Sequence, residues 1–153
     1  MVLRTPGGIS SNLNLTILPA APSVFRSGVA GPKTGIPTIV RSTNNQLVTP
    51  SNPIHFNDQL VIYATGLGQV SPDIKAGFPA PTKPLAVTSV IPIVTLGGMN
   101  VPVEYAGLAP GFVGVYQINL KVPFQSPTGL SVPLTITQGG AATTLSVRVV
   151  GNK

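Results

Sequence analysis

The chain has 153 residues, enough for one domain with its own hydrophobic core and an extension. Only 8% of its residues are charged and none is cysteine, which excludes disulfides, thiolate metal sites and thiol nucleophiles. The net charge of +6 comes from nine Lys and Arg against three Asp and Glu. Because these basic residues are scattered along the chain, nucleic-acid binding is not expected.

No run of 18 apolar residues is present, so we expect no membrane-spanning helix. Residues 1–8 lack the apolar region of a signal peptide, and we expect the sequence to be a mature or trimmed portion of a secreted precursor. A surface poor in charge must be made of Ser, Thr, Asn, Gln, Gly and Pro. Such a surface is typical of extracellular structural proteins, so we expect an extracellular or cell-surface location.

The first predicted element is a strand over residues 12–18. Its apolar side chains are Leu13, Leu15 and Ile17, followed by Leu18, and the alternating polar ones are Asn12, Asn14 and Thr16. This period of two is typical of a half-buried strand. A linker from Pro19 to Pro22 separates it from the rest of the chain. A strand without a sheet leaves unpaired N–H and C=O groups, so we predict that a second copy of the chain pairs with it.

The sequence leaves one alternative open for this element. Residues 12–18 could fold back onto their own sandwich as an eighth strand. Pairing within the protomer, or a segment standing free in solvent, would contradict the prediction of pairing between copies.

Strands then recur, separated by turns. Ile36 to Arg41 and Gln59 to Thr65 are predicted strands joined by a polar stretch over residues 42–58. The stretches from Ser89 to Leu96 and from Met99 to Ala106 meet across Gly97-Gly98, which predicts a tight hairpin.

Three further strands complete the pattern. They are predicted over residues 114–122, 131–137 and 145–149, with a turn at Gly139-Gly140 between the last two. The side chains expected to face inward are Tyr116, Ile118, Leu120 and Val122; Val132, Leu134 and Ile136; and Leu145, Val147 and Val149.

These patterns predict an all-β fold, an immunoglobulin-like β-sandwich of about seven strands with an additional N-terminal strand. We expect an N-terminal extension over residues 1–34, with the donor strand and the Pro-rich linker, and the sandwich over residues 35–153. Pro92, Pro102 and Pro133 lie within strand patterns and are expected at edges or bulges, because proline cannot donate to the ladder.

The stretch Val103 to Asn119, with its core Ala-Gly-Leu-Ala-Pro-Gly at residues 106–111, is distinctive. Together with residues 62–72, 79–81 and 84–85, it resembles an uncharacterised immunoglobulin-like C-terminal domain of large secreted proteins from acidobacterial-type soil bacteria. The resemblance covers residues 19–150 and implies a bacterial source and no catalytic residue. Residues 5–25 resemble the last hairpin of a preceding repeat in such proteins.

Other candidate sites are weaker. Ser51, His55 and Asp58 could be drawn as a triad, but no Gly-framed serine supports it, and a surface or turn histidine is favoured. The acids are too few and too dispersed for a Ca²⁺ site, so no metal or cofactor is expected. Glu104 is expected to pair with Lys121. Asn14-Leu15-Thr16 makes Asn14 a candidate glycosylation acceptor, and glycans are candidate partners.

The leading hypothesis is a non-enzymatic protomer of an extracellular bacterial fibre that assembles head-to-tail by N-terminal strand complementation. Leu13, Leu15, Ile17 and Leu18 would form the assembly strand, with Pro19 and Pro22 in the linker. The alternative is a monomeric interaction or adhesion module at the end of a larger secreted protein. The expected partners are copies of the chain itself, without nucleic acid or a membrane span.

Overall fold

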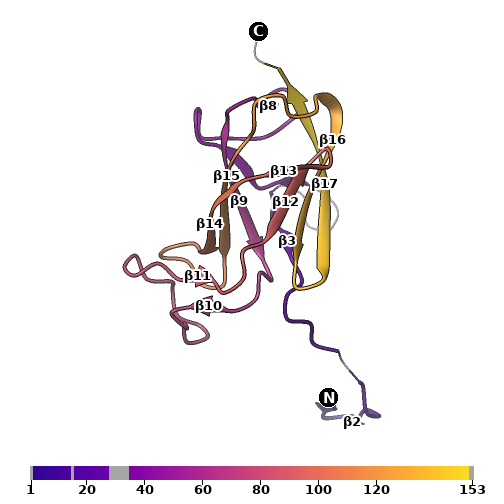
Figure 1. Cartoon of the computed structure of the whole chain (residues 1–153). Helices are drawn as coiled ribbons and strands as arrows, with labels where there is room; N and C mark the ends of the chain where they lie inside the picture. The colour runs from indigo at the N-terminus through magenta and orange to yellow at the C-terminus, as the bar shows by residue number, and fades with distance from the viewer. Residues whose placement is uncertain (1, 15, 28–34, 152–153) are drawn as a thin grey trace.

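A computed structural model describes residues 2–14, 16–27 and 35–151. The described chain is all-β, with two sheets packed face to face, and an extended N-terminal segment leads away from one end of this sandwich (Figure 1). The prediction of an all-β sandwich is confirmed. Among the described residues, no helix is long and apolar enough to cross a bilayer.

The larger sheet contains eight strands among the described residues. In spatial order these are β10 (Val70–Ser71), β11 (Val87–Thr88), β14 (Val103–Leu108), β15 (Tyr116–Lys121), β9 (Gln59–Thr65), β6 (Ile39–Arg41) and β7 (Gln46–Leu47), with β3 (Ser23–Val24) pairing with β9 beside this path. All pairings in this sheet are antiparallel.

The smaller sheet contains five strands in the described part of the chain. Its order is β13 (Met99–Val101), β12 (Ile93–Leu96), β16 (Gly129–Gln138), β17 (Ala141–Val150) and β8 (Ile54–His55). Two short ribbons lie outside the sheets, β1 (Arg4–Thr5) with β2 (Gly8–Ile9) and β4 (Arg26–Ser27) with β5 (Ile36–Pro37). The pairing of β8 with β17 is parallel.

The strand order is consistent with an immunoglobulin-like arrangement. The orders β14-β15-β9-β6 and β12-β16-β17 correspond to the D-E-B-A and C-F-G orders of a constant-type immunoglobulin sandwich. The number of strands differs from the expected seven. The predicted strand over residues 36–41 is divided at Thr38, and the stretch expected to be polar, residues 42–58, contributes β7 and β8.

The core lies between the sheets and is built from the alternating positions that the sequence indicates. Every residue predicted to face inward on the last three strands is buried, except Tyr116, which is half-buried against the core. Burying a side chain of this size contributes about 1.5–3 kcal/mol. The sandwich is therefore stabilised mainly by the burial of every second side chain along β9, β15, β16 and β17.

The prolines within strand patterns lie at positions where no backbone N–H group is needed for pairing with a neighbouring strand. Pro92 precedes β12, and Pro102 separates β13 from β14. Pro133 is inside β16 but beyond the last residue paired with β12, next to a register shift between Gly129 and Val132. These positions fit the expectation of strand ends and bulges.

Candidate assembly site

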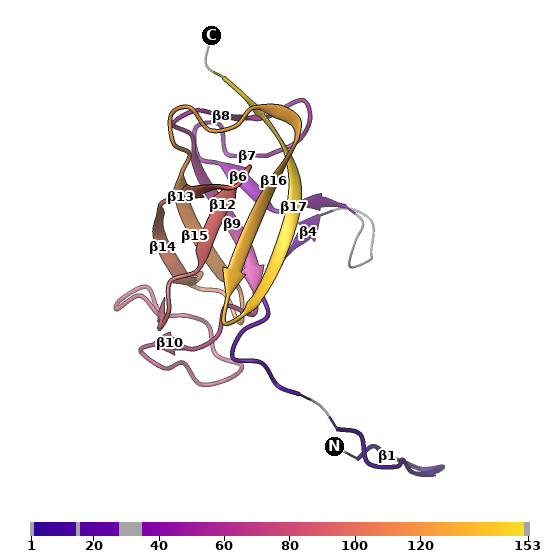
Figure 2. The same ribbon diagram turned by 45° about the vertical axis from the view of Figure 1, so that its right-hand side comes forward.

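The segment predicted to mediate assembly belongs to an exposed N-terminal arm, defined here as residues 2–18. In both ribbon views the arm runs away from the end of the sandwich (Figures 1 and 2). Leu13, Ile17 and Leu18 are 50%, 92% and 54% exposed. Leu15 lies outside the described residues.

The expected additional strand is not formed within the protomer. The described residues of the segment 12–18 belong to no strand and are exposed, Asn14 included. The alternative of an eighth strand on the same sandwich is therefore not observed for them. The physical reason is that a strand has no hydrogen bonds of its own and needs a neighbouring strand to form. One copy of the chain does not test pairing in another copy, which stays a prediction.

The root of the arm is packed against the sandwich. Ala20 is 6% exposed, Val24 is 7% exposed, and Pro22 is buried. The Ala21 amide donates to the carbonyl of Gly66 at 2.8 Å, and β3 then pairs with β9. The linker and β3, which lie within the expected extension of residues 1–34, are thus bonded to the main sheet.

Two glycines make the close approach of this root to the sandwich feasible. Gly66 has φ of +75°, and a Cβ there would lie 2.1 Å from the carbonyl oxygen of Ala21. Gly139 has φ of +58°, and a Cβ there would lie 3.0 Å from the Cβ of Ala20. Because an L side chain at position 66 would both strain the backbone and collide with it, the docking of Ala21 depends on glycine.

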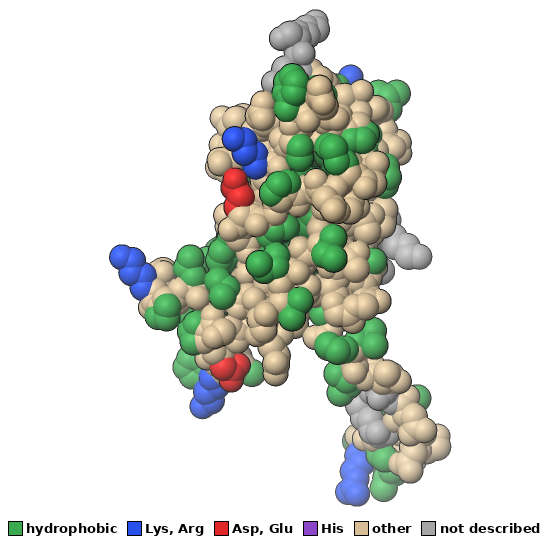
Figure 3. All heavy atoms as spheres, in the orientation of Figure 1, with side chains coloured by type: hydrophobic (Ala, Val, Ile, Leu, Met, Phe, Trp, Pro, Cys, Tyr) green, Lys and Arg blue, Asp and Glu red, His purple; other side chains and the backbone are tan. Residues whose placement is uncertain are grey.

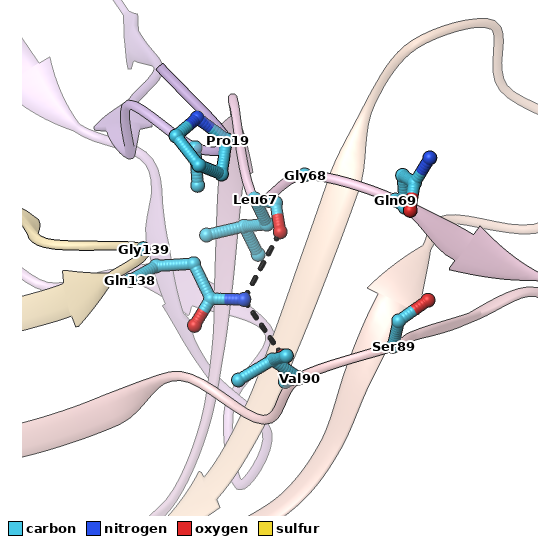
Figure 4. A pocket seen from close by; sticks show the side chains of 9 residues that line it. Pro19, Leu67, Gly68, Gln69, Ser89, Val90, Gln138 and Gly139 are labelled. Carbon is cyan, nitrogen blue, oxygen red and sulfur yellow. Dashed lines mark hydrogen bonds between the residues drawn. The ribbon is translucent and has the colours of Figure 1, made fainter.

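A cavity of about 470 Å³ lies beside the root, lined by Pro19, Leu67, Val90 and Gly139 among others (Figure 4). The buried side chain of Gln138 lines it and reaches toward Leu67 and Val90 (Figure 4). Its Nε2 donates to the carbonyl of Leu67 at 3.1 Å and to that of Val90 at 2.7 Å. This amide therefore ties β16 to loops from both sides of the cavity and holds the exit of the arm in place.

Apolar side chains are also exposed near this end of the sandwich. Phe78, Val90, Ile91, Phe112 and Val113 are each more than half exposed. Phe78 and Val113 line a second hollow of about 320 Å³. On the face drawn in Figure 3, hydrophobic side chains are spread over the sandwich and charged ones are few. Exposed apolar side chains mark an interaction surface where they adjoin one another over a large patch.

The residues considered as a triad have structural contacts instead. The carboxylate of buried Asp58 accepts from Arg41 Nε at 2.7 Å and Arg41 Nη2 at 3.0 Å. It also accepts from the His55 backbone amide at 2.7 Å. His55, for which the sequence favours a surface or turn position, lies half-buried in β8 directly before a turn. Asp58 therefore joins β6 to the loop between β8 and β9.

The expected pair between Glu104 and Lys121 is not formed. Within the described residues the one ion pair is Arg41 with Asp58. Both Glu104 and Lys121 are exposed, and a surface ion pair contributes too little to hold two solvated side chains together. No group of three His, Cys, Asp or Glu in the described ranges could hold a metal ion.

Two tyrosines contribute to the loops at the arm end. The Tyr116 hydroxyl donates to the carbonyl of Gly68, and the Tyr105 hydroxyl donates to that of Leu108 at 2.9 Å. Burial raises the pKa of both hydroxyls. The bond from Tyr116 fixes the loop on which Pro19 and Ala20 rest.

Sequence reasoning missed Gln138, Gly66 and Ala20 as contributors to this site. A signal existed for Gln138, because it continues the inward series of Val132, Leu134 and Ile136 along the same strand. No pattern in the sequence indicates the contact of Ala20 with Gly139, since it depends on how the two segments meet in space.

Comparison with known proteins adds no relative: no protein-family model, no curated protein and no solved structure matches this chain.

Proposed function

We propose that this chain is a non-enzymatic structural protomer of an extracellular bacterial fibre, in which the N-terminal arm of one copy completes a sheet of the next. The observation that carries the proposal is the arm itself. Its segment 12–18 has the alternation of a half-buried strand, yet Ile17 is 92% exposed. A strand with one apolar face is stable only when that face and its backbone groups are covered.

The packed root of the arm supports the same function. Ala20, Pro22 and Val24 are buried and Ala21 is hydrogen-bonded, so the arm leaves the sandwich from a defined point. A donor strand held at its base loses less freedom on binding than one on a loose tether. A head-to-tail contact of this kind is heterologous, so it builds open filaments unless its rotation closes a ring.

The bacterial, extracellular setting belongs to the proposal. It is supported by the low content of charged residues and by the resemblance of residues 19–150 to the immunoglobulin-like domain of secreted acidobacterial-type proteins. Exposed Asn14 keeps its place as a candidate glycosylation acceptor. A screen of the purified chain for hydrolase activity, with His55→Ala as control, tests the non-enzymatic part: turnover that depends on His55 would contradict it.

The assembly is tested by light scattering and negative-stain microscopy over a concentration series. The wild-type chain should form polymers, and Ile17→Asp should abolish them while leaving the circular dichroism spectrum unchanged. Thr16→Asp is the matched control, because it adds the same charge to the polar side of the segment and should retain most assembly. A wild-type chain that stays monomeric, or polymers that persist in Ile17→Asp, would refute the proposal.

A second candidate function is a monomeric interaction module at the end of a larger secreted protein. The exposed apolar residues near the arm end, Phe78, Val90, Ile91, Phe112 and Val113, favour it. In that case the surface would dock another domain, and the isolated chain would remain monomeric. Substitution of Ile91 and Phe112 by Asp should then reduce binding to that domain but change no self-association.

A further inference from the structure

The outer edge of β17 is the longest uncovered strand edge among the described residues. β17 runs over Ala141–Val150 and pairs with β16 on one side, whereas β8 covers only Val149 and Val150 on the other. In the described part of the chain, no strand pairs with that side over residues 141–148. The strands at the other edges, β7, β8, β10 and β13, have two or three residues each. Short edge strands resist pairing with other chains, and a long one invites it.

A groove opens beside this edge, between the margins of the two sheets. It has a volume of about 260 Å³, and Figure 2 shows β17 at the margin of its sheet with β4 beyond it. Ile39, Val48 and Val147 line the groove and are 5% exposed or less. Leu130 also lines it and is 80% exposed. Apolar side chains inserted here would therefore contact the core directly.

Arg148, which lines the same groove, has an unused donor. Its Nη1 donates to the carbonyl of Pro50 at 2.6 Å. Its Nε is buried and has no hydrogen-bond partner among the described residues. Buried donors without acceptors are rare in folded proteins, and such an atom usually has a partner that is yet to be placed. Because this atom is shielded from the outside, an added strand could supply an acceptor only if the Arg148 side chain turned toward the groove.

The two faces of the arm match the two faces of the sheet at this edge. On the outer face, Thr144 pairs with Thr135 at 2.9 Å and Ser146 pairs with Ser131 at 2.6 Å, both through their hydroxyls. On the inner face, Leu145 and Val147 are buried. A strand added beside β17 needs polar side chains outside and apolar ones inside. The segment 12–18 has this alternation, with Asn and Thr against Leu and Ile.

The lengths also agree. Seven residues in extended conformation span about 23 Å and eight span about 26 Å, so the segment 12–18 would cover nearly all of the uncovered edge of β17.

From these observations we infer that the acceptor site for the arm is the edge of β17 over residues 141–148, with its groove, in a second copy of the chain. This inference rests on the proposed function and specifies its acceptor. The occupant is a second copy because the root of the arm is held at Ala20 and the arm leads away from its own sandwich (Figures 1 and 2).

Cysteine cross-linking tests the contact, because the natural chain has no cysteine. Thr16→Cys is mixed with Thr144→Cys, and separately with Ser146→Cys, under mild oxidation, and covalent dimers are quantified on non-reducing gels. The matched control is Asn100→Cys, an exposed position on β13 at the opposite edge of the same sheet. At least one β17 position should give several-fold more dimer than the control, since disulfides need Cβ atoms about 3.5–4.5 Å apart.

A second variant tests the groove without cysteine. Leu130→Asp places a charge at an exposed position and should weaken polymer formation strongly while leaving the fold intact. Ile93→Asp is its control, because Ile93 is 61% exposed on β12 and does not line the groove, and it should assemble like the wild type.

The outcomes separate the two proposals. If the wild type forms polymers that Ile17→Asp abolishes, but neither β17 cysteine cross-links and Leu130→Asp assembles normally, the acceptor site is wrong and the fibre function stands. If the wild type stays monomeric at all concentrations, both fail. A Thr16→Cys/Thr144→Cys double variant that oxidises only within single chains would also overturn both.

Discussion

The arm segment 12–18 and strand β15 have the same alternation of apolar and polar residues, but the structure treats them differently. β15 lies between β14 and β9, and its Ile118 and Leu120 are 0% and 1% exposed. Ile17 in the arm is 92% exposed. Alternation therefore indicates which face of a segment can be buried, whereas neighbouring strands decide whether it is buried. A segment that has the pattern but forms no strand is a candidate for binding.

The largest effect that tests this comparison is the loss of a core isoleucine. Ile118→Ala should lower the free energy of unfolding by about 2–5 kcal/mol, because it leaves a cavity between two sheets. Ile17→Ala, the same change in the arm, should alter the stability of the monomer by less than about 0.5 kcal/mol. Urea unfolding at low protein concentration measures both. A large loss for Ile17→Ala would mean that the arm packs on its own sandwich.

The buried ion pair gives the next effect. Asp58→Ala should cost about 3 kcal/mol of stability, because it leaves the Arg41 guanidinium, whose side chain is 13% exposed, without its carboxylate. Asp73→Ala, at an exposed acid, should change stability by less than about 0.5 kcal/mol. The same urea titration applies. Equal losses in both variants would show that net charge, not the pair, is responsible.

The root of the arm can be destabilised by a substitution in the sandwich, with the sequence of the arm unchanged. Gly66→Ala should cost about 2 kcal/mol, because a side chain at φ of +75° is strained and collides with the Ala21 carbonyl. Gly98→Ala is the control, since it has φ of +84° but open space around it. Hydrogen exchange at the Ala21 amide should accelerate only in Gly66→Ala. Unchanged protection there would contradict the proposed role of this glycine.

The smallest effect concerns pH. Burial raises the pKa of the Tyr116 and Tyr105 hydroxyls above 10.0, so the neutral form is favoured in the folded chain. The stability that this contributes is complete below pH 10.0 and declines as the pH rises through the folded-state pKa. Tyr116→Phe should cost about 1 kcal/mol at neutral pH through the lost bond to Gly68.

Unfolding measured between pH 8 and 11 checks this last prediction, with pH limits that bracket the ordinary tyrosine pKa of about 10. The alkaline decline should be shallower in Tyr105→Phe/Tyr116→Phe than in the wild type. Parallel declines in the two proteins would mean that other groups cause it.

Much of the sandwich could be predicted because its long strands carry a periodic signal. β9 has the predicted bounds, Gln59–Thr65, and the hairpin across Gly97-Gly98 forms as expected. β16 and β17 bury the predicted faces and extend beyond the predicted bounds at both ends. In each of these strands, the side chains that the alternation predicts to face inward are the buried ones. The reason is that each strand pairs along its length with at least one neighbouring strand.

The short strands could not be predicted, because a strand of two residues is too short to show an alternation of apolar and polar side chains. β7 and β8 lie in the stretch that the sequence indicates only as a polar connection. β8 nevertheless covers one end of the β17 edge. Of the candidate site, the sequence indicates the arm and its alternation. The root at Ala20 and the edge of β17 depend on distant segments meeting, which no local pattern describes.

The way Ala21 and β3 join β9 has a mechanical consequence. Tension transmitted along the arm would enter the sandwich at the Ala21–Gly66 bond and the pairing of Ser23 with Thr65, nearly along the axis of β9. Hydrogen bonds loaded lengthwise share the force and must fail together, whereas bonds peeled from one end fail one at a time. A filament built on this joint would resist pulling better than bending, with its compliance concentrated in the few residues before Pro19.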